Sequence, residues 1–343
     1  MKLAVVLFNL GGPDSLAAVE PFLRNLFADP AIISLPAFLR YPLARLIARR
    51  RAPITRGMYA RIGGSSPLLA ETGAQARALE EALAKRGSEA RCFIAMRHWR
   101  PFTEEAASAV KAWAPERIVL LPLYPQYSTT TTASALEAWQ KAAKGIELQT
   151  PQSYACCYPW QNGFVAAETE LLNAVLKRRK QGLAYRVLFS AHSLPKRIVD
   201  KGDPYQWQVE KTVEAILSHF KQEHLDRRIC YQSRVGPLEW IGPATDDEIR
   251  RAGREGKGLI VVPISFVSEH SETLAELDLD YGERLVREAG VPDYIRVSTV
   301  RAHPLFIEGL AALVMAATKT RVSVTCAERR ICPAGKRCGF ALA

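Results

Sequence analysis

Short apolar runs, rich in β-branched residues, alternate along this chain with segments of helical periodicity. The runs at Leu3–Asn9, Arg117–Leu123, Tyr185–Ala191 and Gly258–Ile264 are apolar on both faces, without the alternation of a half-exposed strand. This pattern is typical of strands in a parallel sheet that helices cover on both sides. The order of strands and helices therefore predicts repeated β-α-β units.

Further strands and helices fill the intervals between these runs. The other strands are expected at Arg91–Arg97, Glu147–Thr150, Arg228–Ser233 and Tyr294–Val297. Helices are expected at Thr72–Arg86, Thr103–Ala114, Ala133–Lys144, Gly163–Gln181, Tyr205–Phe220 and Ser271–Ala289. In a chain of 343 residues, four strands in each half predict an α/β protein of two similar doubly wound, Rossmann-like domains. Each domain would hold a four-stranded parallel sheet, with an active-site cleft between the two domains.

The chain divides into two expected domains and a tail. We expect an N-terminal α/β domain at residues 1–150 and a C-terminal α/β domain at residues 151–303. A helix at about 304–318 would pack back on the first domain, and residues 319–343 would form a basic tail that contains cysteines. The N-terminus leads into a strand-like run rather than a secretory signal, so we do not expect a secreted protein.

Composition and motifs exclude several classes of protein. Apolar residues make up 48% and charged residues 24%, which is typical of a globular protein. No uncharged run approaches the roughly 20 apolar residues that span a bilayer. The seven cysteines are odd in number, which indicates a reducing compartment rather than a disulfide scaffold. The glycine-rich motifs of P-loop and dinucleotide-binding proteins, the nucleophile elbow of hydrolases and the HExxH zinc motif do not occur.

Polar residues gather in loops that follow the predicted strands. These loops are Leu10–Pro13, Tyr124–Thr129, Ser190–Pro195 and Phe266–Glu272. In doubly wound folds, ligands bind at the carboxyl ends of the parallel strands. The four loops are therefore expected to meet at one site.

Histidines and carboxylates in these loops could carry chemistry. His192 ends an apolar strand, and His270 and Glu272 follow another. Ser271 is a good N-cap, so Glu272 and Glu276 would lie on one face of the next helix. Acids in a first turn also offset the helix dipole, and a lone histidine is usually structural. Two imidazoles with carboxylates equally match a divalent-ion site or a pair that transfers protons.

Taken together, six segments resemble the ferrochelatase family, in its bacterial type without a transit peptide. They are NLGGPDS (Asn9–Ser15), RIGGSSPL (Arg61–Leu68), LYPQYSTTT (Leu123–Thr131), FSAHSLP (Phe189–Pro195), YQSRVGPLEWIGPATDD (Tyr231–Asp247) and FVSEHSETLAELD (Phe266–Asp278). The resemblance implies an enzyme that inserts Fe²⁺ into protoporphyrin IX to give protohaem, the terminal step of haem biosynthesis. The fold that it implies, two similar four-stranded domains around a cleft, agrees with the strand pattern.

The resemblance also implies roles for individual residues. His192 would take protons from the pyrrole nitrogens or ligate Fe²⁺, with Glu272 facing it as the second catalytic and metal-contacting group. His270 and Glu276 would continue an acidic path for protons or Fe²⁺. The family's porphyrin-binding region matches seven positions here: Leu10, Arg51, Tyr59, Ser66, Arg97, Trp240 and Phe266. The apolar ones would line the macrocycle, and an arginine is well suited to a propionate carboxylate. No nucleotide cofactor is implied.

The net charge of +11 is concentrated in one part of the chain. Residues Pro30–Ala70 contain seven arginines and no acid, which a solvated basic face would explain. Within Ala31–Arg51, however, Leu, Ile and Phe lie between the arginines, a pattern typical of a segment that lies on anionic lipid. We therefore expect a cytoplasmic protein that is peripheral on the inner membrane surface, as a monomer or homodimer. No nucleic-acid partner is expected, since no module for one is visible.

Three cysteines are evenly spaced in the tail: Cys326, Cys332 and Cys338. Many ferrochelatases hold a [2Fe–2S] cluster with cysteines near the C-terminus, and such a cluster needs four ligands. The resemblance makes these three the expected ligands of a possible cluster. The fourth is unassigned, and the remaining cysteines are Cys92, Cys156, Cys157 and Cys230. A basic tail without a cluster is the alternative.

Two other functions compete with protoporphyrin metallation. A chelatase could act on another tetrapyrrole such as coproporphyrin, although the apolar basic segment argues against a more soluble substrate. A non-catalytic haem or porphyrin carrier would need a pocket and an axial ligand but no acids behind them. The conjunction of His192 with Glu272 and Glu276 favours the enzyme.

Overall fold

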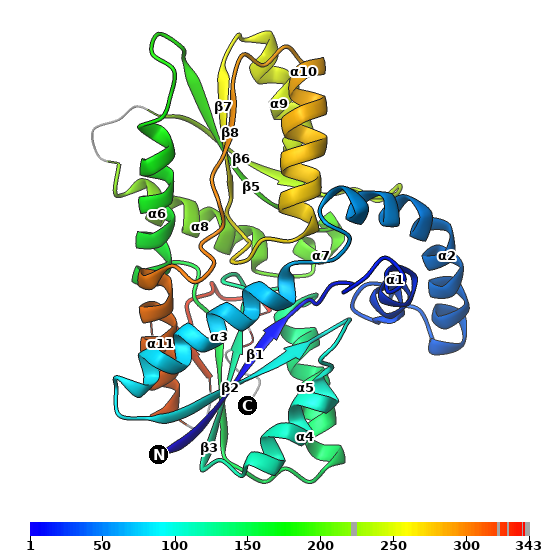
Figure 1. The fold of residues 1–343 in the computed structure, drawn as a ribbon, viewed down its shortest axis with the longest axis vertical. Coiled ribbons are helices and arrows are strands. Elements are labelled where there is room, and N and C mark those ends of the chain that lie inside the picture. Colours follow the sequence, from blue (N-terminus) through cyan, green and yellow to red (C-terminus); the bar gives the residue numbers. More distant parts are fainter. Residues whose placement is uncertain (221–224, 321–322, 328, 338, 340–343) are drawn as a thin grey trace.

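Two parallel sheets, each covered by helices on both faces, make up the body of the molecule (Figure 1). The computed structural model describes residues 1–220, 225–320, 323–327, 329–337 and 339 of the chain. The prediction of an α/β fold with two similar doubly wound domains is confirmed.

The first sheet is built around β1 (Lys2–Asn9), in the order β2-β1-β3-β4-β9. Its other strands are β2 (Glu89–Met96), β3 (Arg117–Pro122), β4 (Gln152–Cys157) and β9 (Ser323–Thr325). Leu3, Val5 and Leu7 pack in a core with the helices α3 (Leu68–Ala84) and α11 (Pro304–Thr318). Alternate residues of the same strand pack on the opposite face against α4 (Thr103–Trp113) and α5 (Thr132–Gly145). Burial on both faces explains why this strand reads as continuously apolar.

The second sheet has the order β6-β5-β7-β8, with β5 (Tyr185–His192) and β7 (Gly258–Pro263) in its centre. Its edges are β6 (Asp226–Gln232) and β8 (Tyr294–Arg296). One face packs on α6 (Asn162–Leu176) and α8 (Tyr205–Leu217), near the short α7 (Lys196–Asp200). The other face packs on α9 (Thr245–Arg254), the π-helix η1 (Glu272–Leu285) and α10 (Val286–Glu288).

Two details of the predicted sheets are wrong. The first sheet has five strands rather than four, because β9 from the tail pairs with β4. The fourth strand lies at Gln152–Cys157 rather than at Glu147–Thr150, and Ile118, Val119 and Leu120 of β3 pair with its first residues. Glu147 has φ +53°, which no regular strand adopts, whereas Ser153 to Cys157 are all buried. A domain boundary at residue 150 would thus separate β4 from its own sheet.

Helix α11 returns to the first sheet after the second domain. Its residues Phe306, Leu310 and Val314 are buried in the same core as β1. It crosses α6 so closely that a Cβ on Gly163 would collide with the Leu305 carbonyl. This crossing fixes the first helix of the second domain against the first domain.

A helical hairpin that the sequence analysis did not anticipate projects from the first domain (Figure 1). It consists of α1 (Val19–Ala28) and α2 (Ala37–Arg61). The two helices share a small core that includes Phe22, Ala48 and Tyr59. Among the described residues, no helix is long and apolar enough to cross a membrane.

One buried carboxyl group makes stability depend on pH. Glu168 on α6 is 1% exposed, and neither of its carboxyl oxygens has a hydrogen-bond partner within the described part of the chain. Burial, with a smaller contribution from the charge of Glu269, raises the pKa of Glu168 to about 8. A raised folded-state pKa contributes stability that is fully present below the unfolded pKa of about 4.5 and is lost as pH rises through about 8.

The variant Glu168→Gln carries a neutral side chain of the same shape. At about pH 8 its free energy of unfolding should therefore exceed that of the wild type by more than about 1 kcal/mol. The advantage should shrink as pH falls towards about 5, which urea unfolding followed by circular dichroism at several pH values would measure. Glu170→Gln is the matched control, since Glu170 lies two residues away on the exposed side of α6. Equal pH dependence in all three proteins would contradict the burial of a protonated Glu168.

Candidate active site

The carboxyl ends of β5 and β7 bring a histidine and a carboxylate face to face. His192 is the last residue of β5, and Glu272 is the first residue of η1, which follows the loop after β7. The distance from His192 Nε2 to Glu272 Oε2 is 3.7 Å. Both residues come from the second domain, and both side chains are partly exposed.

The hydrogen bonds of His192 determine which ring nitrogen is free. Its Nδ1 lies 2.6 Å from the backbone carbonyl oxygen of Ser193. A carbonyl oxygen only accepts, so Nδ1 carries the proton and the neutral ring presents the lone pair of Nε2 towards Glu272. Oε2 of Glu272 is buried and has no hydrogen-bond partner among the described residues. Two acceptors thus share one space with no donor between them, an arrangement suited to receiving a proton or a cation.

His270 supports this pair from behind. Its Nδ1 accepts a hydrogen bond from the Glu272 backbone N–H at 3.0 Å. Its ring meets the ring of Phe266 edge-on, with centroids 4.5 Å apart. Burial lowers the pKa of His270 and outweighs the opposing charges of Glu272 and Glu269, so the ring is neutral. His270 therefore positions the start of η1.

Glu276 is surrounded by donors. Its carboxyl group accepts hydrogen bonds from the Ser233 N–H at 2.9 Å, from the Ser233 hydroxyl, from Gln232 Nε2 at 3.3 Å and from the Tyr281 hydroxyl at 3.0 Å. Ser233 has φ +65°, an uncommon conformation for a residue with a side chain, and it places both of its donors on the same carboxyl. Burial nevertheless raises the pKa of Glu276, and the charge of Glu272 adds to the rise. This carboxyl is therefore a better proton acceptor than an exposed one.

The helix that carries the two carboxylates is a π-helix rather than the expected α-helix. Its hydrogen bonds run from i to i+5, so residues five apart lie above one another, as Glu276 and Tyr281 do. The hydroxyl of Tyr294 donates to the carbonyl of Leu277 at 2.7 Å, which gives that carbonyl a partner from outside the helix. A side chain inserted in this way disturbs an i→i+4 ladder. The π-helix is rare, appears mostly as single turns and is frequent at functional sites.

The first domain reaches this site through α2. The hydroxyl of Tyr59 donates to Ser271 Oγ at 3.3 Å, directly before Glu272. Burial raises the pKa of Tyr59 to about 12, so the phenol keeps its proton. Ser66 packs on the loop after β1, since a Cβ on Gly12 would collide with its side chain. Half-buried Leu10 lies at the start of that loop.

The remaining expected porphyrin contacts are placed differently. Trp240 is half-buried and pairs with Pro195 in the loop after His192, and its Nε1 is buried without a hydrogen-bond partner among the described residues. Arg51 is exposed on α2, with its guanidinium over the ring of Phe27. Arg97, in contrast, is engaged inside the first domain.

The guanidinium of Arg97 lies 2.8 Å from Asp29 Oδ2 and also donates to Ser134 Oγ at 2.8 Å. The ion pair with Asp29 therefore largely neutralises the charge of Arg97.

The loop after β3 serves to join the two domains. Ser128 and Thr129 donate to the buried carboxylate of Asp203, which precedes α8. The Tyr127 N–H donates to Gln208 of α8 at 2.8 Å. This loop was one of the four expected at the site, and its polar groups instead form hydrogen bonds with the second domain.

Sequence reasoning missed Gln232, Ser233 and Tyr281. The first two end and follow β6, so the rule that polar residues gather at strand ends could have found them. Tyr281 could not be found in this way, because its contact with Glu276 depends on the i→i+5 spacing of η1. No group of three or more His, Cys, Asp or Glu side chains that could hold a metal ion occurs within the described ranges.

Comparisons with known proteins agree with one another. The family model described as Ferrochelatase matches residues 2–318. The chain is 55% identical over 315 residues to a ferrochelatase of Caulobacter vibrioides, covering 91% of this chain and 89% of the relative. It is 45% identical over 342 residues to a ferrochelatase of Pelagibacter ubique, covering 98% of both. Among solved structures, the sirohydrochlorin chelatase SirB from Bacillus subtilis has a similar fold, with TM-score 0.54, 14% identity, and coverage of 93% and 96%.

The contact between Tyr281 and Glu276 can be tested without turnover. Tyr281→Phe removes a donor that lowers the pKa of Glu276, so that pKa should rise further above its ordinary value. Infrared difference spectra against pH would follow the carboxyl band, which Glu276→Gln identifies. Tyr185→Phe is the control, because the hydroxyl of Tyr185 donates to Asp293 instead. If the titration is unchanged in Tyr281→Phe, the hydrogen bond from Tyr281 does not affect the pKa of Glu276.

Proposed function

Because this chain belongs to the ferrochelatase family, we propose that it inserts Fe²⁺ into protoporphyrin IX to give protohaem, the terminal step of haem biosynthesis. The chain is an enzyme, a metal-inserting lyase. One observation carries the assignment of the chemistry: His192 Nε2 and Glu272 Oε2 face one another at 3.7 Å as two acceptors without a donor between them.

The reaction exchanges protons for a metal ion. A free porphyrin carries two pyrrole N–H protons, and both must leave as Fe²⁺ forms bonds to the four nitrogens. Nε2 of His192 takes the first proton, for which its lone pair is already oriented. Glu272 takes the second or holds Fe²⁺ as it approaches, and its carboxylate also stabilises the imidazolium that forms. Iron keeps its oxidation state, so no redox step is involved.

Protons leave the site along η1. Glu276, with its raised pKa, lies four residues beyond Glu272 on η1, and Gln232 bridges the two by donating to the Glu272 carbonyl and to the Glu276 carboxyl. His270 holds the backbone of Glu272 and completes the group. These contacts support a path for protons, or for incoming Fe²⁺, through the π-helix.

The macrocycle would lie between the two domains. Phe266, Trp240 and Leu10 supply apolar contacts, while Tyr59 and Ser66 come from the opposite domain. Arg51 is the better placed of the two arginines for a propionate, because Arg97 is engaged by Asp29. A site that fits a puckered ring better than a flat one would expose the nitrogen lone pairs and so favour the transition state.

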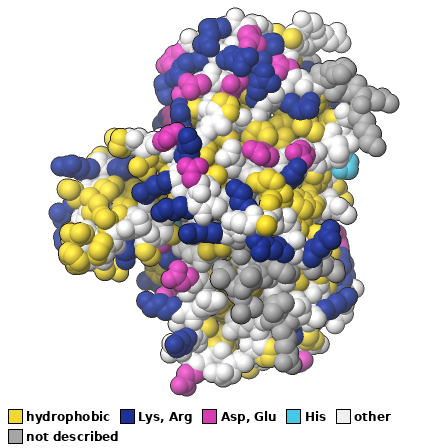
Figure 2. All heavy atoms as spheres, turned by 180° about the vertical axis from the view of Figure 1, so that it is seen from behind, with side chains coloured by type: hydrophobic (Ala, Val, Ile, Leu, Met, Phe, Trp, Pro, Cys, Tyr) yellow, Lys and Arg dark blue, Asp and Glu magenta, His cyan; other side chains and the backbone are white. Residues whose placement is uncertain are grey.

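The hairpin of α1 and α2 supports peripheral contact with a membrane from the cytoplasmic side. Exposed apolar side chains on α2 include Phe38, Leu39, Tyr41, Leu46 and Ile54. Hydrophobic side chains gather at the end of this lobe, with Lys and Arg around them (Figure 2). Apolar groups rimmed by cations are typical of a surface that lies on anionic lipid. Such a surface suits delivery of the water-insoluble protoporphyrin rather than coproporphyrin.

The cysteines of the tail support a [2Fe–2S] cluster as a further part of the proposal. Gln208 Nε2 donates to Cys332 Sγ at 3.1 Å and to Cys157 Sγ at 3.4 Å, so one amide bridges two buried thiols. The Cys326 N–H donates to the Cys157 carbonyl at 3.2 Å. Cys338 lies outside the described residues. Cysteines 326, 332 and 338 would hold the cluster with Cys157 as the fourth ligand, and the Gln208 amide would hydrogen-bond to the thiolates.

The catalytic roles predict a specific pattern of losses. In an anaerobic assay with Fe²⁺ and protoporphyrin IX, His192→Ala and Glu272→Gln should each lower turnover by about 100-fold or more. Porphyrin affinity, measured by fluorescence quenching, should change little. His219→Ala, which removes an exposed histidine on the other side of the second domain, should behave as wild type. Binding without turnover in the wild type would favour a carrier, and faster turnover of coproporphyrin would favour the other tetrapyrrole.

The cluster is tested by colour and composition. Protein purified without oxygen should be red-brown, with about two irons and two sulfides per chain. Cys332→Ser and Cys157→Ser should both bleach it, whereas Cys230→Ser should not, because Cys230 is buried in the second domain near Thr245. Colourless, iron-free wild-type protein from iron-replete cells would contradict the cluster without affecting the metallation assay.

A further inference from the structure

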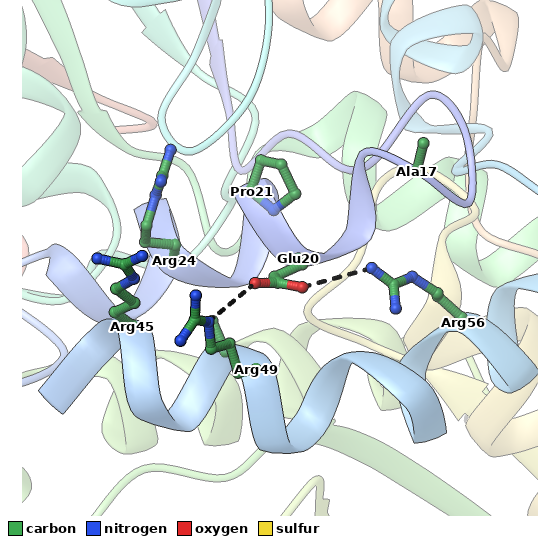
Figure 3. A pocket seen from close by; sticks show the side chains of 8 residues that line it. Ala17, Glu20, Pro21, Arg24, Arg45, Arg49 and Arg56 are labelled. Atoms are coloured by element: carbon green, nitrogen blue, oxygen red, sulfur yellow. Dashed lines mark hydrogen bonds and ion pairs between the residues drawn. The ribbon is translucent and has the colours of Figure 1, made fainter. Parts of the chain in front are cut away.

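A basic cavity lies between the two helices of the projecting hairpin (Figure 3). Its volume is about 320 Å³, and its lining residues are Ala17, Glu20, Pro21, Arg24, Arg45, Ala48, Arg49 and Arg56. Four arginines and a single carboxylate therefore line it. The cavity belongs to neither the metal-inserting site nor the cysteine group.

The arginines of the cavity are only partly neutralised. Glu20 lies between Arg49 and Arg56, with N···O distances of 3.8 and 3.5 Å (Figure 3). Arg24 and Arg45 make no hydrogen bond or ion pair with any described residue. Both line the cavity, and in Figure 3 they lie on the opposite side of Glu20 from Arg56, with the guanidinium of Arg24 directed away from α2. With four cations and one anion, the cavity has a formal charge of +3, which an anionic ligand would offset.

Guanidinium groups favour anions whose oxygens can accept two hydrogen bonds at once. Their planar forks match the oxygens of a phosphate or a carboxylate in pairs, and Arg is prominent wherever phosphate is recognised. The cavity is at the small end of ligand pockets, which range over about 300–1,000 Å³. It therefore suits a small charged group rather than a whole macrocycle.

The surroundings of the cavity indicate where that group comes from. Arg45 and Arg49 lie on α2, and the exposed side chains of Phe38 and Tyr41 (75% and 58%) precede Arg45 by seven and four residues, on the same face of that helix. An anion that reaches the arginines from this side would carry apolar chains that cover those residues. A free phosphate ion would leave them in water.

We propose that the cavity between α1 and α2 binds the phosphate of an anionic phospholipid headgroup. Arg24 and Arg45 take the phosphate oxygens, and Glu20 keeps Arg49 and Arg56 in place. The proposal rests on the membrane contact proposed above and adds a defined site to it. A diffuse basic surface attracts lipid through charge alone, whereas this cavity requires particular arginines.

Two variants of α2 distinguish a defined binding site from attraction by the overall positive charge of the surface. Arg45→Gln and Arg50→Gln remove the same charge five residues apart, but only Arg45 lines the cavity. Co-sedimentation would use vesicles of phosphatidylcholine alone and of phosphatidylcholine mixed with phosphatidylglycerol. Arg45→Gln should weaken binding to the mixed vesicles by about fivefold or more, and Arg50→Gln by clearly less. Calorimetry with inorganic phosphate would show whether the free ion binds.

Each outcome decides the proposal. Equal losses in both variants, or equal binding to the neutral vesicles, would overturn it in favour of diffuse attraction. Phosphate binding that Arg45→Gln abolishes, without any vesicle binding by the wild type, would overturn the lipid as the source. Metallation of protoporphyrin in detergent is measured separately. Its failure in the wild type would contradict the proposed function and leave the cavity's ligand unaffected.

Discussion

Two hydrogen-bond acceptors held face to face are the feature on which the rest of the site depends. A neutral imidazole nitrogen and a carboxylate oxygen at 3.7 Å repel one another unless a proton or a cation lies between them. The protein maintains this arrangement through the backbone: His192 ends a central strand and is anchored to the Ser193 carbonyl, and Glu272 begins η1. Neither anchor involves the atoms that face one another, so both acceptors stay available for substrate.

The same arrangement requires that the two domains keep their relative position. Gln75 of α3 donates to the carbonyls of Val267 and Arg301 at 2.9 and 3.0 Å, which ties the first domain to the loop before η1. Asp203, 1% exposed, accepts from Ser128 and Thr129 across the same boundary. Buried hydrogen bonds of this kind have a definite geometry, and breaking one leaves an unsatisfied group that costs about 1–3 kcal/mol. These hydrogen bonds therefore fix the two domains relative to one another at the site.

The strand pattern predicted most of the fold, and the strand-end rule predicted that the loops with His192 and Glu272 would meet, as they do at 3.7 Å. The prediction failed where local sequence does not determine structure. Gln152–Cys157 was missed because its strand character depends on pairing with β3, and the three residues of β9 are too short to give a pattern. The π-helix was not predicted, and the hydroxyl of Tyr294 that bonds to its Leu277 carbonyl lies seventeen residues further along the chain. Arg97 matched a binding position, yet its partner Asp29 is distant in sequence.

Burial shifts the pKa values of His270 and Glu276, the two groups beside the pair, towards one another. An ordinary histidine holds its proton about two pKa units more tightly than an ordinary glutamate, so passing a proton from one to the other costs about 3 kcal/mol. Burial lowers the pKa of His270 and raises that of Glu276, and both shifts narrow this gap. The cause is the same for both groups, because an apolar surrounding disfavours imidazolium and carboxylate alike. Both shifts lower the cost of passing a proton between an imidazole and a carboxyl group beside η1. The proton path proposed above for porphyrin metallation would use this property.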